Sequence, residues 1–258
     1  MAAVSHYLRP DRLMTLDATV TGTVAESYEA AWLCDGRLQY PVRGPAASGS
    51  PASASLSLSI AGTSRLCGLA VLANHNLDDD VDATLSNGIT ATLKGGSGDR
   101  PNQIPWNRWV SFTPVMADGC DLSVSGNSQD VIIGELLIGQ RFDLSDAPLI
   151  NLSHELPQYA IPLGAEFAAG NGYDKGMAGG RLLEFGYIVE DDALEDAVDG
   201  LRAWEEACRN GTLPSALVPD NSKPEVYVGT IVGFRWEQIG AGLNQVRVLF
   251  QEHPRTRW

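Results

Sequence analysis

The sequence predicts a mainly β protein: an antiparallel jelly roll or β-sandwich, followed by a smaller α/β domain with one amphipathic helix. Glycine and proline are plentiful, at 27 and 14 residues, which favours many turns over long helices. Short apolar or alternating segments recur through the first half of the chain, separated by Asn-Gly, Gly-Gly and Asp-Gly turns. A single segment near the end has helical periodicity instead.

The strands are predicted from alternation and from short apolar runs. Leu56–Ile60 alternates apolar residues with serines, which is typical of a strand with one buried face. Leu66–Ala73 is almost continuously apolar, so we expect a strand buried on both faces. Further strands are expected at Asp82–Leu85, Ile89–Leu93, Trp109–Pro114, Asp121–Ser125 and Ile132–Ile138.

The pattern divides the chain into a sandwich domain at 1–153 with an N-terminal arm, Met1–Arg12, a Gly/Pro-rich connection at 154–180 and a docking domain at 181–258. Within the last part, Asp191–Arg209 has apolar residues at three- and four-residue steps, which predicts a helix that docks on a sheet. Strands are expected on both sides of this helix: Arg181–Val189, Glu225–Trp236 and Gln245–Gln251.

Charge and motifs exclude several classes of function. The formal net charge of −14, with no basic stripe, argues against a nucleic-acid partner. No apolar run is long enough to span a membrane, and the start lacks the apolar core of a secretion signal, so we expect assembly in a cytoplasm. Nucleophile elbows, phosphate-binding loops and zinc-ligand spacings are missing, and the four cysteines are far apart. We therefore expect no enzyme and no resident cofactor.

An acidic segment suggests one metal hypothesis. Asp78, Asp80 and Asp82 have the alternating spacing that begins an EF-hand loop, but Ala83 replaces the required glycine and Ile89 the bidentate glutamate. An EF-hand is therefore excluded. A looser calcium site in a sandwich loop remains one interpretation, and a solvated acidic loop is the other, which we favour because blocks of like charge are usually solvated.

Aromatic residues suggest a glycan site. Trp106 and Trp109, close to Asn102, Asn107 and Arg108, would form a platform on which a sugar ring stacks while amides fix its hydroxyls. The loop that begins at Asn74 and Asn76 would border this platform. The alternative, which we favour, is that one tryptophan packs in the core and the other covers its rim.

The order of several short motifs resembles one protein family. Leu33-Cys34-Asp35-Gly36, the strand Leu56–Ile60 and the segment Val71–Leu77 are similar to discoidin-like jelly-roll domains of tailed-phage tail and baseplate proteins. Ile133–Gly139 is similar to the strand that closes such domains. The C-terminal segments resemble the end of siphophage tail-tip proteins, namely Ala216–Asp220, Tyr227–Thr230 and Val246–Glu252.

This resemblance implies a structural component of a phage tail tip or baseplate, located in the virion and assembled in the host cytoplasm. It implies contacts with other virion tail proteins in a homo-oligomeric ring, made by the C-terminal domain and the arm Met1–Arg12. It supplies no catalytic residue. The alternative function is a carbohydrate-binding module that attaches to a host-surface glycan through Trp106, Trp109, Asn74 and Asn76.

Overall fold

The chain is described as a computed structural model over residues 4–36, 40–49, 53–94, 107–144, 150–155, 177–178, 181–191, 194, 200–210, 214–253 and 255–256. Its elements are β1 (Ser5–Leu13), β2 (Thr19–Gly22), the 3₁₀ helix η1 (Ala30–Cys34), β3 (Val42–Arg43), β4 (Ala54–His75), β5 (Ala83–Ser86), β6 (Ala91–Leu93), β7 (Asn107–Asn127), β8 (Ile132–Leu144), β9 (Ile150–Glu155), β10 (Met177–Ala178), β11 (Arg181–Glu190), α3 (Leu201–Asn210), β12 (Ser215–Val218), β13 (Tyr227–Gly240), β14 (Leu243–Glu252) and β15 (Arg255–Thr256).

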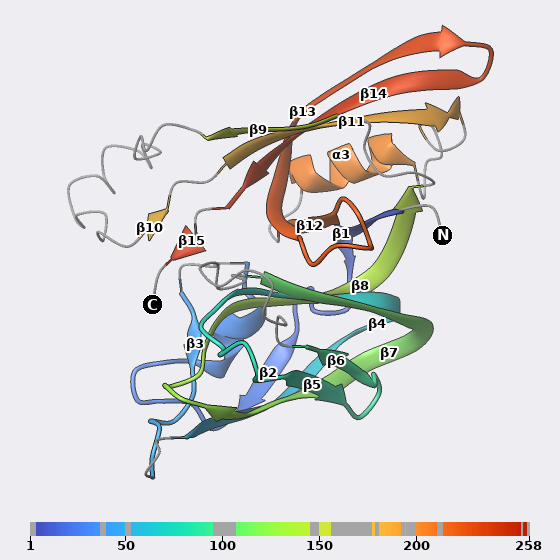
Figure 1. Cartoon of the computed structure of the whole chain (residues 1–258). Helices are drawn as coiled ribbons and strands as arrows, with labels where there is room; N and C mark the ends of the chain where they lie inside the picture. Colours follow the sequence, from blue (N-terminus) through green and yellow to red (C-terminus); the bar gives the residue numbers. More distant parts are fainter. Residues whose placement is uncertain are drawn as a thin grey trace.

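The protein is mainly β and antiparallel, as the sequence predicts. One hydrogen-bonded path runs β6-β5-β7-β4-β8-β1-β12-β13-β14-β11-β9, with β2 paired to β4 and β3 to β8. In Figure 1 the blue and green strands form a sandwich, and the orange strands form a second sheet with α3 against it. No helix in the described ranges is long and apolar enough to cross a membrane.

Two long strands carry the sandwich from one layer to the other. The segments predicted as separate strands at Leu56–Ile60 and Leu66–Ala73 join in β4, and those on either side of Asp118-Gly119 join in β7. The pairing of these strands shifts register between Ala61 and Arg65. A side chain at Gly119 would meet the Ile60 carbonyl oxygen at 2.5 Å, so this glycine permits close packing rather than a turn.

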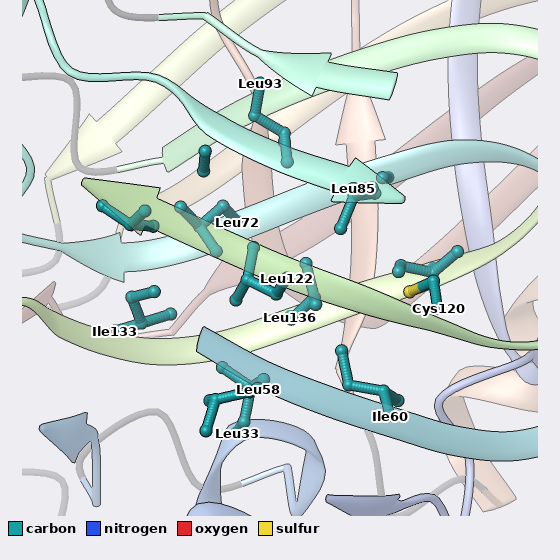
Figure 2. Close-up of a cluster of buried hydrophobic side chains, with 14 of the residues drawn as sticks. Leu33, Leu58, Ile60, Leu72, Leu85, Leu93, Cys120, Leu122, Ile133 and Leu136 are labelled. Carbon is teal, nitrogen blue, oxygen red and sulfur yellow. The ribbon is translucent and has the colours of Figure 1, made fainter. Parts of the chain in front are cut away.

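The apolar core of the sandwich lies between its two layers of strands. Leucines from β4, β5, β7 and β8 interdigitate there, and Leu33 of η1 closes one side (Figure 2). Leu58, Leu72, Leu122 and Leu136 are at most 1% exposed. Full burial of one such side chain contributes about 1.5–3 kcal/mol, so this cluster dominates the stability of the first half.

The segment expected to be an N-terminal arm is an internal strand from Ser5 onwards. β1 pairs with β8 of the sandwich along one edge and with β12 of the second sheet along the other. Tyr7 and Leu8 are buried, on opposite faces, in two different apolar clusters. β1 therefore joins the two parts of this chain, and it does not form the free arm on which the predicted contact with other subunits depends.

Helix α3 covers one face of the second sheet. The apolar stripe predicted for the helix is buried at Leu194, Leu201, Trp204 and Cys208. Trp204 stacks on Tyr7 at 4.3 Å between ring centroids and donates its indole N–H to Ser215. The predicted helical residues 192, 193 and 195–199, and most of the predicted connection at 154–180, lie outside the described residues.

Candidate functional site

The 3₁₀ helix η1 presents one side chain to the core and its neighbour to the surface. Residues follow one another at about 120° in such a helix, because it has about three residues per turn. Leu33 is fully buried in the sandwich core, whereas Trp32 is only half-buried. A turn that begins at Ala25 and contains Ser27 in the left-handed region (φ 70°) leads into the helix and places Tyr28 before it.

Three aromatic side chains gather around η1. The rings of Tyr28 and Trp32 meet edge to face with centroids 5.8 Å apart, and those of Trp32 and Tyr40 do so at 6.2 Å. Tyr40 is 51% exposed, which leaves much of its ring open to solvent. We call Tyr28, Trp32 and Tyr40 the aromatic cluster. An edge-to-face contact covers at most one face of each ring, and the exposed ring of Tyr40 keeps surface on which another molecule can stack.

The ion pair of Arg43 and Asp130 lies beside this cluster. The Arg43 guanidinium lies 5.8 Å from the centre of the Tyr28 ring, within the range of a cation–π contact. It also donates to the Asp130 carboxylate from Nη2 at 2.6 Å and from Nε at 3.1 Å. Hydrogen bonds to Tyr28 and Asp130 raise the pKa of Arg43, so the cation persists at every working pH.

The carboxyl of Glu135 lies beneath the loop that follows η1. This side chain is fully buried, and its Oε2 accepts a hydrogen bond of 3.0 Å from the backbone N–H of Gly36. Burial, and then the nearby charge of Asp35, raise the pKa of Glu135 well above its usual value. The loop is therefore anchored by a carboxyl group that favours its protonated form.

The residues predicted to bind a glycan are used inside the protein where the structure describes them. Trp109 is half-buried between the sandwich and the second sheet, where it packs edge to face on His6 at 6.0 Å. Asn74 is buried, and its backbone N–H donates to Asn107. Asn76 bonds the chain around Asp130 and Ile132. Trp106 and Asn102 lie outside the described residues.

The acidic segment surrounds a buried arginine. Arg108 is 4% exposed, and its guanidinium donates to the carbonyl oxygens of Leu77, Asp78 and Val81. Burial lowers the pKa of Arg108, and the charges of Asp79, Asp82 and Asp78 oppose that shift. The aspartates thus act as counter-charges to this guanidinium.

The predicted calcium ligands do not form a metal-binding group. Among the residues that the structure describes, no set of three or more His, Cys, Asp or Glu side chains is arranged to hold a metal ion. Asp78 instead accepts a hydrogen bond from the backbone N–H of Ser128, while Asp80 and Asp82 are exposed. All four cysteines are buried and free of disulfides, as expected from their spacing.

The aromatic cluster escaped the sequence analysis because its members are separated by irregular chain. Tyr28 and Trp32 are four residues apart, which indicates one helical face, but Tyr40 follows after a turn at Asp35-Gly36. The tryptophan pair at Trp106 and Trp109 offered a denser local signal. The density of aromatic residues between Tyr28 and Tyr40 is the signal that could have identified the cluster.

Comparison with known proteins finds similar solved structures for about half of the chain. No family model matches the chain, and no curated protein matches it in sequence. Among solved structures, it is similar to chitosan-binding module 1 of a chitosanase/glucanase from Paenibacillus sp. IK-5, with 16% identity, a TM-score of 0.38 and coverage of 50% of this chain and 98% of that one.

Two further solved structures have similar scores. The family 32 carbohydrate-binding module of NanJ from Clostridium perfringens, in complex with galactose, has 16% identity and a TM-score of 0.36, and 53% of this chain covers 99% of it. The lectin domain of lectinolysin, complexed with Lewis B antigen, has 13% identity and a TM-score of 0.35, with 48% of this chain on 92% of that one. At these values the likeness assigns no ligand to this chain.

Proposed function

We propose that this chain is a non-catalytic glycan-binding protein whose ligand stacks on the aromatic cluster. The observation that carries the proposal is the 51% exposed ring of Tyr40, which contacts the half-buried ring of Trp32 in a cluster whose Tyr28 lies against Arg43. A pyranose ring has an apolar C–H face that packs on aromatic rings and a rim of hydroxyls that needs hydrogen-bonding partners. The cluster offers both kinds of surface within one short segment of chain.

The chemistry of the neighbouring polar groups supports a binding role. The Tyr40 hydroxyl can donate to and accept from sugar hydroxyls, while Arg43, which donates to Asp130 and lies over the Tyr28 ring, holds that ring in place. The proposal therefore moves the predicted glycan site from Trp106, Trp109, Asn74 and Asn76 to the opposite flank of β8.

Calorimetric titration tests the proposal with galactose, a chitosan oligosaccharide and the Lewis b antigen as probes. We expect at least one probe to bind, and Trp32→Ala or Tyr40→Ala to weaken binding by about tenfold or more, since loss of a central aromatic contact typically costs more than 1.4 kcal/mol. Trp236→Ala is the matched control, because Trp236 is also exposed, at 43%, but lies on the second sheet.

Two outcomes would remove the proposal. One is that no probe binds the wild-type protein, and the other is that Trp32→Ala binds as well as Trp236→Ala. Trp106→Ala belongs in the same series, because a loss of binding in that variant alone would return the site to the residues predicted from the sequence.

We also propose a second function, that of an assembly subunit in a phage tail tip or baseplate within the virion. Exposed apolar side chains on β11, β13 and β14 favour it: Ile188 and Leu243 share one face of the sheet, Trp236 lies on the face that α3 covers, and Val232 and Ile239 lie at the two register shifts of β13. Apolar groups gathered on one sheet often mark a protein contact. Sedimentation of the wild-type protein and of Ile239→Lys tests this: an oligomer lost in the variant supports it, and a monomeric wild type contradicts a self-assembling ring.

A further inference from the structure

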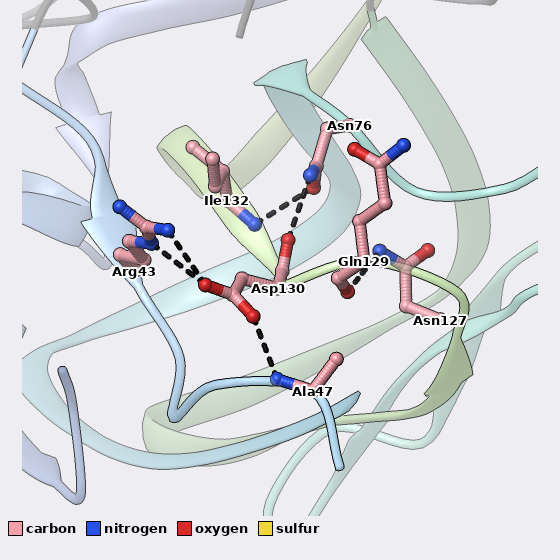
Figure 3. A network of polar contacts seen from close by, with 7 residues as sticks. All are labelled: Arg43, Ala47, Asn76, Asn127, Gln129, Asp130 and Ile132. Atoms are coloured by element: carbon pink, nitrogen blue, oxygen red, sulfur yellow. Dashed lines mark hydrogen bonds and ion pairs between the residues drawn. The ribbon is translucent and has the colours of Figure 1, made fainter. Parts of the chain in front are cut away.

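The segment Asn127–Ile132 lies between the aromatic cluster and the acidic segment, and it forms hydrogen bonds with residues of both regions. Asp130 lies at its centre, and its carboxylate accepts from Arg43 and from the backbone N–H of Ala47 at 2.6 Å (Figure 3). Its backbone oxygen accepts from the Asn76 side chain at 2.7 Å, and Asn76 in turn accepts from the backbone N–H of Ile132. Asp130 is thus hydrogen-bonded through both its backbone and its side chain.

Arg43 connects Asp130 to the aromatic cluster through two contacts. Its backbone oxygen accepts from the N–H of Ala25 at 2.8 Å, at the start of the turn that places Tyr28. Its guanidinium lies over the Tyr28 ring, and that ring meets Trp32. The arginine therefore contacts both the backbone and the ring on which the position of Trp32 depends.

We propose that Arg43 and Asp130 are positioning residues that fix the aromatic cluster in its ligand-binding arrangement. This inference rests on the proposed glycan-binding function. A free arginine side chain samples many rotamers, whereas two donors to one carboxylate hold the guanidinium plane in place. Hydrogen bonds from Ala47 and Arg43 lower the pKa of Asp130, so the carboxylate stays ionised for this task.

The rest of the network makes Asp130 rigid rather than available to a ligand. The side chain of Asp130 is 20% exposed, against 40% for Arg43. Its carboxylate already accepts hydrogen bonds from two groups of the protein, so its effect on a sugar would pass through the arginine and the tyrosine. Asn76, predicted as a direct glycan contact, has the same supporting role one step further from the cluster.

A double-mutant cycle with Asp130→Asn and Arg43→Gln measures this coupling. Asparagine keeps the shape of aspartate and an oxygen for the Ala47 N–H, but it loses the charge that holds Arg43. We expect each single variant to weaken binding of the strongest of the three probes by about tenfold, and the double variant to bind no worse than the weaker single variant, because the two residues act as one unit. Arg247→Gln is the control, since Arg247 pairs with Glu184 on the second sheet.

The aromatic NMR signals of Tyr28 and Trp32 give a readout that does not depend on a ligand. We expect these signals to shift in Asp130→Asn and Arg43→Gln and to remain in place in Arg247→Gln. Unchanged signals, or unchanged affinity in both variants, overturn the positioning role. If the wild type binds none of the probes while the signals still shift, the proposed function fails and the control of ring position by Asp130 stands.

Discussion

Two tryptophan regions of the sandwich each hold a half-buried indole ring, and they differ in what surrounds that ring. Around Trp109, the ring packs on His6, the neighbouring amides bond the backbone, and Arg108 is surrounded by carbonyl oxygens. Around Trp32, the ring contacts are also edge to face, but the neighbouring Tyr40 is 51% exposed. The difference shows that a binding surface needs side chains whose faces and hydrogen bonds are not already used by the fold.

The largest expected effect is the loss of stability when the buried Arg108 near Trp109 is replaced. Arg108→Met should destabilise the protein by about 3–5 kcal/mol, because it removes a buried cation and leaves three carbonyl oxygens and several carboxylates without their partner. Urea unfolding measures the change. Arg235→Met, at an exposed position on β13, is the control and should change stability by less than about 0.5 kcal/mol. An equally stable Arg108→Met would contradict the structural role of Arg108.

Replacing Trp109 should reduce the stability of the protein more than replacing Trp32. Trp109→Ala should cost about 3 kcal/mol, since it opens a cavity between the sandwich and the second sheet. Trp32→Ala should cost about 1 kcal/mol, because its ring, half-buried like that of Trp109, packs on the exposed Tyr40 and not between two sheets. Thermal unfolding of both variants measures these losses of stability. Equal losses would mean that Trp32 is as much a core residue as Trp109.

A smaller effect concerns the carboxyl beneath the cluster. The pKa of Glu135 is raised in the folded protein, so the native state binds more protons than the unfolded state between the two pKa values, and stability falls as pH rises through that window. Glu135→Gln cannot ionise and should lack this fall, so its melting temperature should exceed that of the wild type at pH values beyond the window. Parallel pH profiles of the two proteins would argue against a buried, protonated carboxyl.

Calcium should have the smallest effect. Because the Arg108 guanidinium already occupies the carbonyl oxygens of the acidic segment, added calcium should leave the melting temperature within about 1 °C of its value in chelator. A ligand that bound the native state at a hundred times its dissociation constant would add about 2.7 kcal/mol, which is readily measured. A clear rise in melting temperature that is lost in Asp78→Asn would restore the calcium hypothesis.

The fold was predictable where burial follows a simple period. Alternation in Leu56–Ile60 and the apolar run at Leu66–Ala73 identified strand residues, and the helical stripe identified α3. The continuation of β4 and β7 through their bends was not predictable, because Gly62 and Asp118-Gly119 have the residue types of turns. Strand β1 was not predicted either, since the charged residues and proline of Arg9–Arg12 obscure a strand that pairs on both sides.

The candidate site was less predictable, because its members meet only through tertiary structure. The sequence correctly indicated that Asn76 and Asp78 lie at the end of a buried strand, but the partners of those residues come from Asn127–Ile132, about 50 residues away. Arg43 and Asp130 are 87 residues apart. No local pattern specifies such a pair, since its formation depends on the register of β3 against β8.

In the proposed function, a ligand contacts the aromatic cluster and does not contact Trp109, which lies between the two sheets. The most direct measurement follows the indole N–H signals of Trp32, Trp106, Trp109 and Trp236 while the strongest-binding probe is added. We predict that the Trp32 signal shifts with the ligand, together with ring signals of Tyr28 and Tyr40, while Trp109 and Trp236 stay in place. A shift of Trp106 or Trp109 with Trp32 unmoved would contradict this account.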